Sequence, residues 1–130
     1  MISDLPGDLR YTKEHGWLRK EEDGTVTMGI TDYSQDTLGE LVYIELPEIG
    51  QELETGGELA VVECIKAADD IQAPVAGEVV HVNENLFQHP EIVNSDPYGD
   101  GWIACIQPFE DLSRTMTPDQ YQSMLDSISD

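Results

Sequence analysis

The sequence predicts one mainly β domain in which two similar half-sheets face each other. Its 130 residues can bury one core but leave little room for a second. Short apolar and β-branched runs alternate with glycine, proline and acidic turns along most of the chain. Segment 39–44 also resembles segment 77–82, and two such copies suit the facing halves of a sandwich. We therefore expect a single domain over 1–130.

The strands follow from local turn signals. Glu22-Asp23-Gly24 is typical of a tight turn, so the flanking segments 16–19 and 25–30 are predicted to form a hairpin. Pro47 should stop the next strand. The remaining strands are expected at 41–46, 58–64, 77–82 and 102–106, with irregular or briefly helical chain over 85–94. These strands would form a core over about 9–108.

Two helices carry capping signals. Asp32, with Gln35 three residues later, is expected to cap a short helix that Gly39 ends. Near the C-terminus, Thr117 and Gln120 form a capping box around a proline at the first helical position. Apolar residues at helical spacing follow that box: Tyr121, Met124, Leu125 and Ile128. The pattern predicts an amphipathic helix over about 118–129 that docks on its own sheet.

Lys66 is the candidate functional residue. It lies between the apolar run 59–65 and the segment 67–77, so it is expected at or beside a strand-to-strand turn. An amine at such a tip stays solvated and reachable, and acylation would join a group to it through a stable amide. A solubilising lysine in a turn is the alternative that spacing alone favours.

Charge and cysteine content limit the classes of partner and compartment. The net charge of -21 opposes binding to nucleic acid or to an anionic membrane and favours protein partners with basic patches, although plain solubility also explains it. Cys64 and Cys105 are too few for a disulfide framework or a zinc site, which indicates a reducing compartment. We expect a soluble monomer in the cytoplasm, or in the mitochondrial matrix if a eukaryotic presequence was removed.

No catalytic constellation is evident. The three histidines, His15, His81 and His89, are not accompanied by a nucleophile in an elbow sequence, and no metal site is indicated. Cys64 is interpreted as a small residue in a strand. The residues therefore favour a carrier or binding module over an enzyme.

The residues around these elements resemble those of a known family. The matching stretches run in order along nearly the whole chain: 11–15, 29–33, 38–47, 62–67, 74–78 and 93–102. Together they are similar to the H proteins of the glycine cleavage system, which are lipoyl carriers.

The resemblance implies a lipoyl/biotinyl-type β-sandwich, a barrel-sandwich hybrid of two related half-sheets, with lipoate on Lys66. It implies a non-enzymatic carrier that shuttles an aminomethyl group between glycine decarboxylase, the aminomethyltransferase and dihydrolipoyl dehydrogenase. A lipoate-attaching enzyme would be a further partner. Glu63 and Asp70 are the residues implied in recognition of the arm or of the lysine that receives it.

This chain departs from the family pattern near the expected arm cleft. Gly16 stands where members usually carry glutamate, and Thr37 stands where several carry histidine. Cys64 occupies a position that is often serine. Loss of the carboxylate at 16 would weaken docking of a cationic arm, unless Glu14 substitutes for it.

Three alternatives remain open at this point. A related carrier could serve mainly in lipoate donation or in another lipoyl-dependent shuttle, which the missing glutamate allows. A biotin carrier domain typically flanks its lysine with methionines, whereas Ile65 and Ala67 flank Lys66 here. A purely structural acidic domain would carry no modification.

Overall fold

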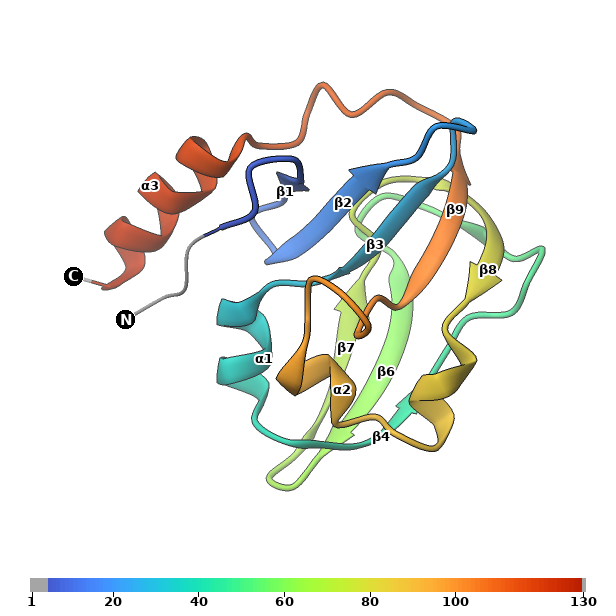
Figure 1. Cartoon of the computed structure of the whole chain (residues 1–130), viewed down its shortest axis with the longest axis vertical. Coiled ribbons are helices and arrows are strands. Elements are labelled where there is room, and N and C mark those ends of the chain that lie inside the picture. The colour runs from blue at the N-terminus through green and yellow to red at the C-terminus, as the bar shows by residue number, and fades with distance from the viewer. Residues whose placement is uncertain (1–4, 130) are drawn as a thin grey trace.

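The computed structural model describes residues 5–129. Short strands dominate it, and helices lie at the periphery (Figure 1). The elements follow the chain in this order: β1 (Arg10–Tyr11), β2 (Gly16–Lys20), β3 (Val26–Ile30), α1 (Asp32–Leu38), β4 (Leu41–Glu45), β5 (Glu52–Leu53), β6 (Glu58–Cys64), β7 (Ala68–Gln72), β8 (Gly77–Val82), the 3-10 helix η1 (Glu84–Phe87), α2 (Ile92–Ser95), β9 (Ala104–Pro108) and α3 (Pro118–Ser129).

The described strands form two antiparallel sheets. The larger sheet has the order β1-β2-β3-β9-β8-β5, and the smaller has the order β4-β6-β7. The segments that resemble each other in sequence cover most of β4 and all of β8, which lie in different sheets. The predicted mainly β sandwich is therefore confirmed, although one sheet has six strands and the other three.

Two apolar clusters hold the sheets and the helices together. The larger cluster contains inward side chains of both sheets, among them Met28, Ile44, Val62, Val79 and Ile106, all essentially inaccessible to solvent. Close packing of such side chains between two sheets is the main source of stability in a sandwich. A smaller cluster forms where α3 covers the first strands, and its buried members are Leu9, Tyr11, Trp17, Tyr121 and Leu125.

The C-terminal helix begins as its capping box predicts. The Thr117 amide donates to Oε1 of Gln120 at 2.9 Å, and the Gln120 amide donates to Oγ1 of Thr117 at 3.2 Å. The helix packs along β1 through Tyr121 and Leu125 (Figure 1). Ile128 was expected on this apolar face but is 50% exposed, in the last turn of the helix.

The predicted cap of α1 is corrected by one residue. Thr31, and not Asp32, is the N-cap, because its Oγ1 accepts a hydrogen bond from the Ser34 amide. Asp32 lies within the helix and accepts from the Gln35 side chain at 2.8 Å. The helix ends at Gly39, whose φ of 82° suits glycine, as predicted.

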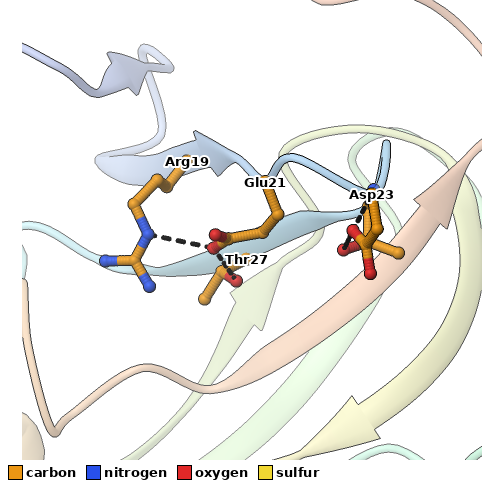
Figure 2. Close-up of polar contacts among 5 residues, drawn as sticks. Arg19, Glu21, Asp23 and Thr27 are labelled. Carbon is orange, nitrogen blue, oxygen red and sulfur yellow. Dashed lines mark hydrogen bonds and ion pairs between the residues drawn. The ribbon is translucent and has the colours of Figure 1, made fainter.

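The β2–β3 hairpin contains an ion pair, Arg19 with Glu21, next to its turn (Figure 2). Arg19 Nε lies 3.0 Å from Oε2 of Glu21, and the Thr27 hydroxyl donates to the same oxygen at 2.6 Å. The bond from Thr27 lowers the pKa of Glu21, with a smaller contribution from Arg19. Asp23 accepts from the Thr25 amide and hydroxyl, which fixes the turn. Arg19 is thus held locally, far in sequence from Lys66.

Candidate functional site

Lys66 lies in the turn of the β6–β7 hairpin. Glu63 pairs with Ala68, and the Cys64 amide donates to the Ala67 carbonyl at 2.8 Å, so the chain reverses over Ile65 and Lys66. All three residues from Ile65 to Ala67 are exposed. In Figure 1 this turn lies at the bottom of the molecule, at the end opposite the segment that joins β9 to α3. The lysine is therefore accessible to a large partner.

Backbone contacts with the start of β4 hold the turn, and Cys64 next to it is buried. The Ile65 amide donates to the Glu40 carbonyl at 3.1 Å, and Leu41 pairs with Cys64. Cys64 is buried, and this burial, with the nearby Asp69 carboxylate, raises its pKa. A protonated, shielded thiol is a poor nucleophile. The interpretation of Cys64 as a small residue filling a strand position is confirmed.

A cleft of about 440 Å³ lies along the outgoing strand of this hairpin. One wall is β7, a second is the face of α1, and the third is the loop before β2. Its apolar lining comes from Ile30, Leu38 and Ile71. Such a volume lies in the range of small-ligand sites, so the cleft can hold a flexible side chain or its attached group.

Carboxylates border the cleft. Glu14, Asp69 and Asp70 all line it and are exposed. Asp70, which the sequence singled out, therefore lies at the cleft. Glu63 does not line it and lies on β6, between Tyr43 of β4 and Ala68 of β7. Sequence reasoning gave no site role to Asp69, although its position next to Asp70 on an edge strand was a usable signal.

His15 occupies an unusual backbone conformation in the cleft wall. Its φ is 69°, a region in which histidine is tolerated better than most residues. Two bonds fix it there, since its amide donates to the Thr12 carbonyl and its carbonyl accepts from the Thr31 amide, each at 3.0 Å. Its ring lies 4.5 Å from the ring of Tyr33, and Nδ1 lies 2.7 Å from the Tyr121 hydroxyl.

Burial favours the neutral form of this histidine. Desolvation lowers the pKa of His15, and the Glu14 carboxylate opposes that shift. Sequence reasoning assigned no site role to His15 or Tyr33. The contact with Tyr121 joins residues 106 positions apart, and no local pattern reveals it.

Gly16 and Thr37, the two departures from the family pattern, both line the cleft. A Cβ atom at Gly16 would lie 2.9 Å from Cγ of Pro74 and 3.3 Å from Oγ1 of Thr12. Real Cβ atoms are hardly ever so close to a proline ring. Glycine at position 16 therefore lets Pro74 pack against this wall. The carboxylate nearest to Gly16 in the sequence is that of Glu14.

The described residues contain no group of three or more histidine, cysteine or acidic side chains placed to hold a metal ion. Within the same part of the chain, no helix has the length and apolar character needed to span a membrane. A small sandwich that presents Lys66, exposed in a hairpin turn, next to a cleft is the arrangement of a carrier-type protein.

Comparison with known proteins identifies the family. The family model described as glycine cleavage H-protein matches residues 9–128, so the chain belongs to the glycine cleavage H-protein family. It is 48% identical to the glycine cleavage system H protein of Psychrobacter sp. (strain PRwf-1) over 126 residues, which cover 95% of this chain and 100% of that protein. It is 47% identical to the H protein of Xylella fastidiosa (strain Temecula1 / ATCC 700964), over 97% of this chain and 98% of the other.

A solved structure agrees with the sequence relatives. The crystal structure of a glycine cleavage system H protein from Mycobacterium marinum has a TM-score of 0.85 and 34% sequence identity, and the match covers 94% of this chain and 99% of that one. The predicted family and the lipoyl-type sandwich are confirmed. None of these matches supports the lipoate-relay or biotin-carrier alternative.

Proposed function

We propose that this protein is the lipoyl carrier of the glycine cleavage system and that lipoate is joined as an amide to Nζ of Lys66. One observation carries the assignment to this residue. Lys66 is exposed in a hairpin turn whose outgoing strand, β7, forms a wall of the cleft. An arm attached there starts next to the cleft that can receive it. Membership in a lipoate-bearing family supports the choice of group.

The residues around Lys66 fit such an arm. Exposure of Ile65 and Ala67 leaves room for an attaching enzyme to cover the lysine. The apolar lining of the cleft suits the hydrocarbon part of the arm, and the carboxylates at its border suit a cationic amine. Glu14 and Asp70 line the same cleft from different elements, so we propose that Glu14 takes the role of the glutamate missing at Gly16.

When bound, the lipoyl group supplies a disulfide that accepts an aminomethyl unit and is later restored by oxidation. The protein itself positions the lipoyl group. Lys66 fixes one end of the arm, and the ladders of β6 with β4 and β7 keep that point rigid. A covalent tether raises the effective concentration of its load at each partner site and replaces free diffusion between them.

The proposed partners are glycine decarboxylase, the aminomethyltransferase, dihydrolipoyl dehydrogenase and a lipoate-attaching enzyme. Membership in the system supports partner enzymes as a class. The net charge of -21 favours basic docking surfaces on all of them. We propose a monomer that makes no bond change itself and acts in the cytoplasm, or in the mitochondrial matrix if the source is eukaryotic.

Intact-mass analysis after expression in a lipoylating host tests the assignment. We expect the wild type to gain the mass of one lipoyl group and Lys66→Arg to gain none. Lys20→Arg is the matched control, since Lys20 is also an exposed lysine next to a hairpin turn, and it should be lipoylated normally. A lipoylated Lys66→Arg protein, or a biotinyl mass on the wild type, would contradict the proposal. Glycine–bicarbonate exchange with the decarboxylase then tests the function of the modified protein.

A further inference from the structure

A β-bulge beside Lys66 turns two successive apolar side chains toward solvent. The pairing of β4 with β6 shifts between Leu41, opposite Cys64, and Tyr43, opposite Glu63. In a regular strand, neighbouring side chains point to opposite faces, so one of Val42 and Tyr43 would enter the core. Instead Val42 is 51% exposed and Tyr43 is 46% exposed. Bulges near functional sites often re-aim side chains in this way.

These two residues lie next to the turn that carries the lysine. The Glu40 carbonyl accepts from the Ile65 amide at 3.1 Å, which holds the start of β4 against the β6–β7 turn. Ile65 is itself 68% exposed. We call Val42, Tyr43 and Ile65 the collar. Single exposed apolar residues are ordinary on protein surfaces, but a group around a functional lysine indicates an interaction site.

Apart from Lys66, the charged side chains around the collar are acidic. Lys66 is the only lysine or arginine between residues 21 and 113 of the sequence. Glu40 and Glu63 are exposed beside the collar, and Asp69 lies on the far strand of the hairpin. Acylation of Lys66 removes its positive charge and leaves this end of the molecule wholly anionic. A complementary partner must therefore bring lysine or arginine.

We propose that the collar docks onto glycine decarboxylase, at an active-site mouth that has an apolar floor and a rim of lysine or arginine. This inference rests on the proposed function. An enzyme that draws the arm into a closed site must cover the surface around Lys66. The collar is part of that surface. Aromatic and aliphatic side chains buried at the centre of an interface carry most of its binding energy, and charged rims set the approach. Loss of the lysine charge also favours the modified carrier over the unmodified one.

Glycine decarboxylase is the probe for the first test. The lipoylated wild type, Val42→Ser/Tyr43→Ser and Ile49→Ser/Phe109→Ser are compared, because Ile49 and Phe109 are exposed apolar residues outside the collar. Intact mass confirms equal lipoylation, and urea unfolding confirms the fold. We expect the collar variant to raise KM and the dissociation constant about tenfold with kcat nearly unchanged. The control variant should stay within about twofold of the wild type.

A second test isolates the charge and needs no bound lipoate. Lys66→Gln imitates the neutral acylated lysine, and Lys66→Arg keeps the positive charge. We expect Lys66→Gln to bind the decarboxylase several-fold more tightly at low salt, and the difference to shrink as salt rises. Equal binding of these two variants, or a collar variant that behaves as the control, overturns the proposal. If lipoylated wild type is not used by the decarboxylase at all, the proposed function fails first and this inference falls with it.

Discussion

Nδ1 of His15 and the hydroxyl of Tyr121 lie 2.7 Å apart and join the C-terminal helix to the cleft beside Lys66. The same hydroxyl lies 2.8 Å from Oγ1 of Thr31, the N-cap of α1. One side chain of α3 is therefore bonded to two walls of the cleft, the loop before β2 and the start of α1. The ring of Tyr121 also stacks on Tyr11, with centroids 4.9 Å apart.

Removal of the Tyr121 hydroxyl should destabilise the protein. Tyr121→Phe keeps the stack on Tyr11 but leaves His15 and the fully buried Thr31 without this shared partner. We expect a loss of about 1–3 kcal/mol in the free energy of unfolding, measured by urea denaturation. Tyr43→Phe is the control at an exposed tyrosine and should change stability by less than about 0.5 kcal/mol. Equal stability of the two variants would show that the hydroxyl contacts contribute nothing measurable.

Protonation of His15 should weaken the fold as pH falls. Because burial lowers the pKa of His15 in the folded state, the unfolded chain binds the proton more readily below the ordinary value of 6.5. Its contribution to stability is present above that value and is lost as pH decreases, while Glu14 moderates the effect. His15→Asn removes the titration, and asparagine tolerates the positive φ.

Urea unfolding at about pH 7.5 and about pH 5.5 measures this dependence. The wild type should lose more stability than His15→Asn over the interval. Subtracting the change of the variant from that of the wild type removes the contribution of the many carboxylates, which titrate in both proteins. A wild type whose pH dependence matches that of the variant would contradict the assignment of this loss to His15.

A side chain at position 16 should strain the cleft wall. Gly16→Ala places a Cβ atom 2.9 Å from Cγ of Pro74, so one of the two segments must move. We expect a destabilisation of about 1–3 kcal/mol by chemical denaturation, as for other overpacked sites. Gly7→Ala is the matched control, because its Cβ would have no neighbour within 4 Å. If both variants unfold at the same urea concentration, Pro74 moves away from the new Cβ atom with no measurable loss of stability.

Asn94 should be needed to fix the start of β4. Its Oδ1 accepts from the Leu41 amide at 2.9 Å, and its Nδ2 donates to the Gly39 carbonyl at 2.8 Å. Asn94→Leu leaves both backbone groups unpaired, and we expect a loss of about 2–4 kcal/mol. Faster amide exchange at Ile65, which is bonded to the Glu40 carbonyl, should accompany it. Asn85→Leu, at an exposed position of η1, should leave that exchange rate unchanged.

Local chemistry explains which elements were predictable. The reciprocal bonds of Thr117 and Gln120 involve residues three apart, so the capping box in the sequence predicts them directly. Turn glycines and β-branched runs likewise place the β2–β3 hairpin and the turn at Lys66. The N-cap of α1 was misplaced by one residue because Thr31 and Asp32 both have side chains that can cap a helix, and only the backbone direction distinguishes them.

The sequence by itself determined the longer strands, the terminal helix and the exposed lysine, since these depend on residues close together in the chain. It did not predict the two-residue strands β1 and β5, and it placed the last strand at 102–106 where β9 spans Ala104–Pro108. Only the tertiary structure decided the cleft, the bond between His15 and Tyr121, and the bulge that exposes Val42. Each of these depends on the register of one segment against a distant one. Register is set by packing of the whole core, so it cannot be predicted from the periodicity of a single strand.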